Sequence, residues 1–102
     1  GNRVKNIKGD GISSEVKVKL AEEMVSNQLL KDQDISQLEF KLIRYSRSQV
    51  PPNYKTNGDY IEAKLKDGSA LVFSKNGNYL FKLIEKDGRK HFEEKQANNN
   101  SK

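Results

Sequence analysis

The sequence predicts an α+β domain in which one amphipathic helix packs on a four- to five-stranded antiparallel meander. The first observation is a helical pattern of apolar residues in the first third of the chain. The second is a series of segments that alternate apolar and polar residues, the period of a half-buried strand. The third is a set of turn dipeptides between these segments at near-constant spacing: Asn57-Gly58, Asp67-Gly68, Asn76-Gly77 and Asp87-Gly88. We expect type I′ hairpin turns there, because Asn and Asp tolerate positive φ and Gly has no Cβ to clash.

The helix is predicted over residues 14–30, with Ser13 or Ser14 as its N-cap. Residues 1–11, before it, form either a short edge strand or a flexible arm. Apolar residues at steps of three and four predict the buried face of the helix: Val18, Ala21, Val25 and Leu29, with Leu20 and Met24 beside them. The opposite face is expected to lie in solvent: Glu15, Lys19, Glu22, Glu23 and Ser26.

The strands are predicted in order along the rest of the chain: residues 38–49, 60–66, 69–75, 78–86 and 89–94. A long loop over residues 50–59 separates the first strand from the second, because Pro51-Pro52 stops strand pairing. Residues 78–86 are apolar on both faces at their centre, which predicts a central strand. Residues 89–94 are short and highly charged, which is typical of an edge strand.

Composition limits the size of the core. The chain has 102 residues, of which 33% are hydrophobic and 32% are charged. A chain of this length forms one domain and buries only about 60 to 68% of its unfolded surface, so we do not expect a large active-site cleft. We expect the domain to comprise residues 1–95 and the polar tail 96–102 to be disordered, since the tail has nothing to bury.

The chain is basic, with 19 Lys and Arg against 14 Asp and Glu, a net charge of +5 and a sequence pI near 9.4. The excess is spread evenly, with nine basic and seven acidic residues in residues 1–50 and ten and seven in residues 51–102. A dedicated nucleic-acid binder concentrates its basic residues on one stripe or face. The even spread favours solubility as the explanation and leaves a functional basic face as the alternative.

Cysteine is absent, which excludes disulfides, thiolate nucleophiles and Cys-ligated metals. No apolar run approaches the roughly 18 residues that a membrane-spanning helix needs. The chain begins with Gly1 rather than Met, which indicates either a processed protein or a piece of a longer one. The localisation stays open, with an extracytoplasmic location favoured over a cytoplasmic one.

The sequence offers no arrangement that we expect to be catalytic, cofactor-binding or metal-binding. His91 is the one histidine, and no Cys or second His accompanies it. Asp32, Asp34 and Ser36 have the opening spacing of a calcium loop, but Gln37 and Ile43 stand where that loop needs Gly and Glu. We therefore expect a non-catalytic module without cofactors.

Recognition by a surface is the remaining prediction. We expect a protein partner to bind at the sheet face that the helix leaves uncovered or at the loop over residues 50–59. The candidate residues are aromatic, basic or proline: Lys41, Tyr45, Pro51, Pro52, Tyr54, Tyr60, Lys64, Lys66, Tyr79 and Lys82. The alternative is a DNA- or RNA-binding sheet face that uses Lys41, Tyr60, Lys64 and Lys82, since aromatic rings stack on bases and lysines neutralise phosphates. A purely structural alternative is that tyrosine simply favours half-exposed strands.

Residues 60–80, YIEAKLKDGSALVFSKNGNYL, resemble the hairpin of PepSY-like domains, also called beta-lactamase-inhibitor-protein-like domains. In that family a helix is followed by a strand, an Asp-Gly or Asn-Gly turn, a strand that ends in Phe, and a second Asn-Gly turn. The resemblance covers about a fifth of the chain. It implies an extracytoplasmic, non-enzymatic module that binds or inhibits another protein, and it transfers no functional residues.

Residues 75–90, KNGNYLFKLIEKDGRK, are similar to the three-stranded arm-site DNA-binding domain of tyrosine integrases. That domain places its sheet in a major groove of DNA. Its helix follows the sheet, whereas the predicted helix of this chain precedes the sheet, so we rank this similarity second.

Overall fold

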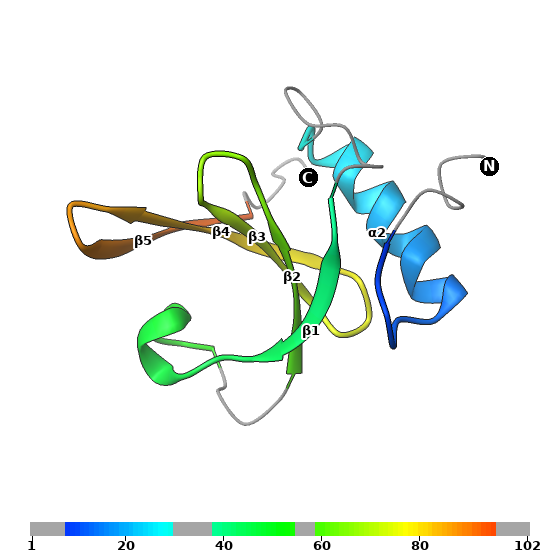
Figure 1. The fold of residues 1–102 in the computed structure, drawn as a ribbon, viewed down its shortest axis with the longest axis horizontal. Coiled ribbons are helices and arrows are strands. Elements are labelled where there is room, and N and C mark those ends of the chain that lie inside the picture. The colour runs from blue at the N-terminus through cyan, green and yellow to red at the C-terminus, as the bar shows by residue number, and fades with distance from the viewer. Residues whose placement is uncertain (1–7, 30–37, 55–58, 96–102) are drawn as a thin grey trace, which may run out of the picture.

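In the computed structural model, one helix packs on a five-stranded antiparallel sheet, which confirms the predicted α+β fold (Figure 1). The structure describes residues 8–29, 38–54 and 59–95. The arm over residues 1–7 and the tail over residues 96–102, for which we made predictions, lie outside the described residues.

The helix α2 extends over Ser14–Ser26. Its N-cap is Ser13, one of the two predicted residues: the Ser13 hydroxyl accepts the Val16 N–H at 3.2 Å and satisfies one of the free amides of the first turn. It ends earlier than predicted. Gln28 adopts a left-handed φ of 57°, and its N–H donates to Val25 O while the Leu29 N–H donates to Met24 O. This pair of bonds is the Schellman motif, which stops the helix.

The buried face of α2 differs from the predicted one. Leu20, Ala21, Glu23 and Met24 are buried. Val18 and Val25 are 39% and 49% exposed, so their assignment to the core was wrong. The helix is rotated so that its larger apolar side chains, Leu20 and Met24, reach the sheet, which buries more apolar area than the two valines offer.

The sheet is a meander in which each strand pairs with the next, in the order β1-β2-β3-β4-β5. Its strands are β1 Phe40–Arg44, β2 Asp59–Lys64, β3 Ala70–Ser74, β4 Tyr79–Lys86 and β5 Arg89–Glu94. β4 lies between β3 and β5, and β5 is an edge strand, both as predicted. The first strand is shorter than predicted, because the chain leaves the sheet after Arg44 and forms a short 3₁₀ helix, η2, over Arg47–Gln49.

The described turns are of two kinds, and only one is the predicted I′ turn. At Asp87-Gly88 both residues have positive φ, 55° and 75°, as a two-residue I′ turn requires. In the turns at Gly68 and Gly77 only the glycine has positive φ. There Leu65 pairs with Ser69 and Ser74 with Asn78, so each loop has three residues and the glycine forms a bulge. Residues 57–58 lie outside the described part.

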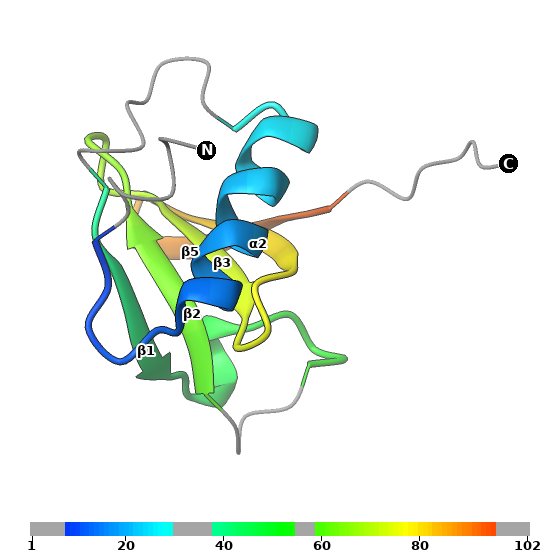
Figure 2. The same ribbon diagram turned by 90° about the vertical axis from the view of Figure 1, so that its right-hand side faces the viewer.

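Each face of the sheet has its own buried cluster. The cluster under α2 is the larger one: Ile12, Leu20, Ala21, Met24, Leu38, Phe40, Ile61, Ala63, Leu71, Phe73 and Tyr79. The cluster on the opposite face is smaller: Tyr45, Val50, Tyr60, Val72 and Phe81. The helix lies along one side of the sheet (Figure 2), and the segment that carries η2 lies on the other (Figure 1).

A register shift between β3 and β4 explains how β4 serves both clusters. Val72 pairs with Phe81 and Phe73 with Tyr79, so Leu80 is an extra residue on β4. Such a bulge changes the side of the sheet that the following residues face. Tyr79 therefore lies under the helix, whereas Phe81 lies on the opposite face.

Candidate protein-interaction site

Residues 45–54 cover the sheet face opposite the helix. Tyr45, Val50 and Pro51 are almost fully buried there. The tyrosines that we expected on an open face are therefore inaccessible. Tyr45, the first residue of the segment, and Tyr60 are buried between the segment and this face, and Tyr79 lies on the other face, 7% exposed. The expectation of an exposed tyrosine-bearing sheet was wrong, because the apolar residues after β1 fold back onto the sheet and remove their own surface from water.

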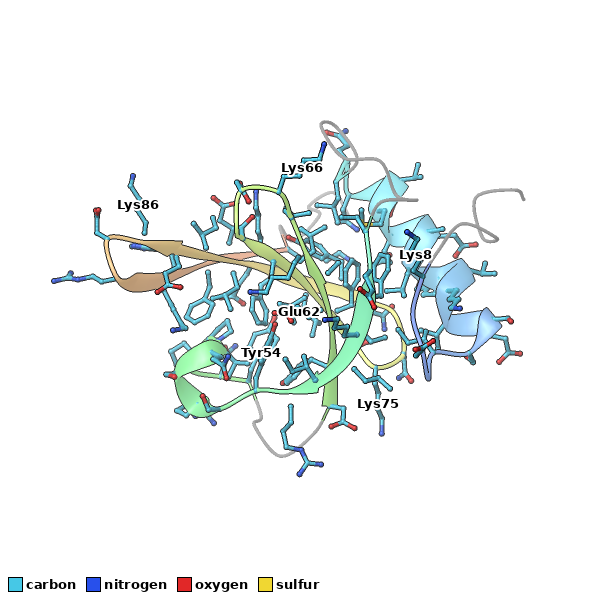
Figure 3. The ribbon with its side chains drawn as sticks, in the orientation of Figure 1. Lys8, Tyr54, Glu62, Lys66, Lys75 and Lys86 are labelled. Carbon is cyan, nitrogen blue, oxygen red and sulfur yellow. The ribbon has the colours of Figure 1, made fainter. Side chains whose placement is uncertain are left out.

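A buried carboxylate fastens this cover to the sheet. The Tyr45 hydroxyl donates to Glu62 Oε2 of β2 at 2.9 Å, and Glu62 is only 8% exposed. The Tyr45 ring also stacks on Tyr60, with centroids 5.7 Å apart. Burial and the nearby Glu62 carboxylate both raise the pKa of Tyr45, so the hydroxyl keeps its proton and remains a donor. In Figure 3, Glu62 lies on the same side of the sheet as Tyr54.

Hydrogen bonds within the segment fix its shape. The Ser46 N–H donates to Gln49 Oε1 at 2.9 Å, and Arg47 Nη1 donates to the carbonyl of Pro52 at 2.9 Å. The Tyr54 N–H donates to the carbonyl of Pro51 at 3.0 Å. An irregular segment needs such bonds, because its backbone groups have no sheet or helix partners.

Tyr54 connects the segment to the far edge of the sheet. Its ring meets Phe81 edge-on at 5.3 Å, and Phe81 in turn meets Phe92 of β5 edge-on at 5.6 Å. Burial, and then the Glu94 carboxylate, raise the pKa of the Tyr54 hydroxyl. The cover is thus held at both ends, by Glu62 and by the aromatic cluster.

The outer side of the segment remains open to solvent. Its exposed residues are Ser46, Arg47, Ser48, Pro52 and Asn53, and Tyr54 is half-buried. We call this set the 46–54 surface. It combines a positive charge, hydroxyl and amide groups, and an apolar proline on a backbone that is already ordered.

The structure separates the predicted lysines. Lys41 and Lys64 are exposed and project from the same sheet face as Glu62. Lys82 pairs with Leu71, whose side chain lies under the helix, so Lys82 projects from the opposite face. Lys66 lies in the turn after β2 (Figure 3). Of the predicted surface residues, the structure brings together Tyr45, Pro51, Pro52, Tyr54 and Tyr60, and most of these are buried.

Two carboxylates, Glu62 and Glu23, are buried although the sequence pattern does not predict it, and the expectation that Glu23 lies in solvent was wrong. Glu62 alternates correctly with Ile61 and Ala63, and only the cover makes its face an interior one. Glu23 lies between α2 and the sheet, where Glu23 Oε1 accepts the Tyr79 N–H at 2.7 Å and lies 3.5 Å from Lys95 Nζ. No sequence signal identifies Glu23, since its partner amide becomes available only at the β4 bulge.

A shallow depression of about 810 Å³ lies where the end of α2 meets the end of β5. Its lining is mostly polar: Ser26, Asn27, Gln28, Leu29, Tyr79, Glu93, Glu94 and Lys95. Burial raises the pKa of Tyr79 to about 12, so this hydroxyl is not poised to exchange protons near neutral pH.

Within the described ranges, the side chains of His, Asp and Glu form no group of three that could hold a metal ion. No helix in the same ranges is long and apolar enough to cross a membrane. Comparison with protein-family models, with curated proteins and with solved structures gives no match. The resemblances to PepSY-like domains and to the integrase arm-site domain thus remain predictions.

Proposed function

We propose that this chain is a non-catalytic binding module that contacts another protein through the 46–54 surface. The observation that carries the proposal is that this surface is exposed while its backbone is held in place. The Tyr45–Glu62 hydrogen bond ties the segment to the sheet, and hydrogen bonds to the carbonyls of Pro51 and Pro52 hold it internally. A loop that orders only on binding loses about 0.5 to 1.5 kcal/mol for each side chain it immobilises. Here much of that ordering has already taken place during folding, which favours recognition of a partner.

The titratable groups support a structural rather than a catalytic role. Within the described residues, the groups whose pKa values are shifted are Tyr45, Tyr54 and Tyr79, raised chiefly by burial, and Asp67. The pKa of Asp67 is lowered by hydrogen bonds from Ser69 within a solvent-exposed turn. The similarity of residues 60–80 to PepSY-like domains agrees with this proposal and extends it to an extracytoplasmic location.

Nucleic-acid binding is the competing function, and the geometry favours it less. It requires exposed aromatic rings beside lysines, but Tyr60 is only 8% exposed and Lys82 lies on the other face from Lys41 and Lys64. Bases could stack on Tyr60 only if residues 45–54 first detached from this face of the sheet.

A photo-crosslinking amino acid at Asn53 tests the proposal, with the same amino acid at Glu22, on the exposed side of α2, as the matched control. We expect a specific adduct in cells that produce the chain from position 53 and none from position 22. The captured protein is then purified and its affinity measured by calorimetry against the wild type and Asn53→Arg. We expect Asn53→Arg to weaken binding at least about tenfold, the effect of losing about 1.4 kcal/mol at the centre of an interface.

Retardation of DNA and RNA is measured in parallel across salt concentrations. Affinity that falls steeply with salt, together with no adduct from position 53, would replace the proposal with the nucleic-acid function.

A further inference from the structure

Among the described residues, the outer edge of β5 has no backbone partner, and its outward N–H and C=O groups form a regular array. The Lys95 N–H donates to Leu80 O at 2.8 Å, so it points toward β4. Because N–H groups alternate in direction along a strand, the amides and carbonyls of Lys90, Phe92 and Glu94 point away from β4. No strand in the described part of the chain pairs with this edge.

The charges along β5 are segregated. The basic residues Arg89, Lys90 and His91 come first, and the acidic residues Glu93 and Glu94 follow Phe92. All of these residues except Phe92 are exposed, and Phe92 is half-buried. Charged side chains of either sign are enough to discourage pairing at an edge, so segregation of the two signs is an additional feature. A strand that is basic in one half and acidic in the other is complementary to a second copy of itself in antiparallel orientation.

We propose that this chain self-associates through β5, with Phe92 of one copy opposite Phe92 of the other on a two-fold axis. In this register Lys90 lies opposite Glu94 of the second copy, and His91 lies opposite Glu93. The backbone groups of Lys90, Phe92 and Glu94 then meet the same groups of the partner and form a ladder. The two sheets become one continuous antiparallel sheet.

The aromatic cluster supports this register. Phe92 already contacts Phe81 at 5.6 Å and lies on the face covered by residues 45–54. Its pairing with a second Phe92 joins the two aromatic clusters across the axis, and aromatic pairs stabilise neighbouring strands. Glu94 is also near the Tyr54 hydroxyl, which leaves its second oxygen available to Lys90 of the other copy.

One pair opposes the association. Arg89 lies opposite Lys95 of the second copy, at the ends of the ladder. Lys95 is partly neutralised by Glu23, 3.5 Å away, so the repulsion is reduced. A first shifted register moves the two-fold axis from Phe92 to Glu93 and places Glu93 opposite Glu93, so like charges meet. A second moves the axis to His91, which leaves Glu94 opposite Gly88 and shortens the ladder. The charges therefore disfavour the first shift, and the shorter ladder disfavours the second in spite of its Arg89–Glu93 pair, so the axis at Phe92 is favoured.

Charge reversal at the two ends of β5 tests the proposal. A strand-edge interface is small and weak, so sedimentation is measured from roughly 10 µM to 1 mM protein. Lys90→Glu and Glu94→Lys each place like charges opposite one another twice in the homodimer, and we expect each to weaken association about tenfold. An equimolar mixture of the two variants restores opposite charges and should recover association. Lys66→Glu, in the exposed turn after β2, carries the same charge change away from the edge and should leave association unchanged.

Arg89→Glu fixes the register. It converts the repulsive Arg89–Lys95 pair into an attractive one, so we expect stronger association; in the register with its axis at His91 it would oppose Glu93 and weaken association. In the wild type, the amides of Lys90, Phe92 and Glu94 should exchange more slowly with deuterium at high protein concentration. A chain that stays monomeric at millimolar concentration overturns the proposal. So does a dimer that is insensitive to charge at positions 90 and 94. Neither result bears on the 46–54 surface.

Discussion

The two faces of the sheet are closed in different ways. One is covered by α2, a regular helix whose backbone satisfies itself, and the other by the irregular segment 45–54, whose backbone depends on local side-chain bonds. Each cover is fastened by one buried carboxylate, but from opposite sides. Glu23 belongs to the helix and accepts a sheet amide, whereas Glu62 belongs to the sheet and accepts a hydroxyl of its cover. A thin domain can thus bury both faces of a single sheet when each cover is anchored by a polar contact at one point.

The clusters also differ in size. Among the described residues, eleven that are buried form the helix-side cluster and five form the cluster under the segment. Regions with fewer buried apolar contacts open more readily without global unfolding. We therefore expect the 45–54 cover to open before the helix does.

The largest expected change in the free energy of unfolding comes from truncating one phenylalanine in each buried cluster, Phe73 under the helix and Phe81 under the segment. Phe73→Ala removes a buried ring that contacts Phe40 and Tyr79, and we expect a loss of about 3 to 5 kcal/mol in the free energy of unfolding. Phe81→Ala should cost about 3 kcal/mol, the low end, because the smaller cover can collapse onto the space. Urea denaturation measures both. Hydrogen exchange should show faster exchange of residues 45–54 in Phe81→Ala, and equal acceleration in α2 would contradict the comparison.

Substituting two turn glycines compares a turn that packs against α2, at Gly77, with a turn whose glycine faces open space among the described residues, at Gly68. Gly77 and Gly68 have φ values of 98° and 91°, but a Cβ at Gly77 would lie 2.9 Å from Lys19 Cβ of α2, whereas at Gly68 it meets nothing within 4 Å. We expect Gly68→Ala to cost about 1 to 2 kcal/mol from backbone strain alone. Gly77→Ala should cost about 1 kcal/mol or more beyond that, because the helix must shift. Thermal unfolding of the two variants is compared, and equal losses would show that the turn does not support α2.

The anchor of the 45–54 cover is tested by Tyr45→Phe. This change leaves the Glu62 carboxylate buried without its donor, and we expect a loss of about 1 to 3 kcal/mol. Glu62→Gln in the same background completes a double-mutant cycle, in which a coupling of about 0.5 to 3 kcal/mol indicates a direct contact. A coupling near zero would mean that Tyr45 acts through its ring alone.

Alkaline pH should destabilise the protein through its buried tyrosines. The pKa of Tyr79 is raised to about 12 from 10.0, and that of Tyr45 is raised further in the same direction, so the folded state holds these protons more tightly than the unfolded state. The contribution of these two tyrosines to the free energy of unfolding is therefore fully present below pH 10, and it is lost as the pH rises from 10 toward 12. Tyrosine absorbance followed with circular dichroism tests this. Ionisation of all tyrosines near pH 10 in a protein that is still folded would refute it.

The smallest effect concerns the end of the helix. Gln28 has a φ of 57° at the position where helices usually place glycine. Gln28→Gly should stabilise the protein by about 0.5 to 1 kcal/mol, because it relieves the left-handed strain. Gln28→Ala, which keeps the strain, is the control. A lower melting temperature for Gln28→Gly would show that the Gln28 side chain has a role of its own.

Much of the fold could be predicted from local pattern. The N-cap at Ser13, the order of the strands, the central position of β4 and the edge position of β5 all follow from residue spacing and turn chemistry. These features depend on interactions between residues close in sequence, which alternation and capping report directly.

The candidate site could not be predicted in the same way. The residues after β1 look like a continued strand, and only their packing against Tyr60, Val72 and Phe81 turns them into a cover. Which side of α2 is buried depends on which of its apolar residues fit against the sheet. Glu23 is an interior residue because its carboxylate accepts the Tyr79 N–H at the β4 bulge.

The sequence by itself determined the meander, the positions of its turns and the charge pattern of its last strand. The tertiary structure alone decided what covers each face of the sheet, which carboxylates are buried and which tyrosines a partner can reach. The physical reason is that periodicity records the two faces of each element, whereas burial depends on what a distant segment covers.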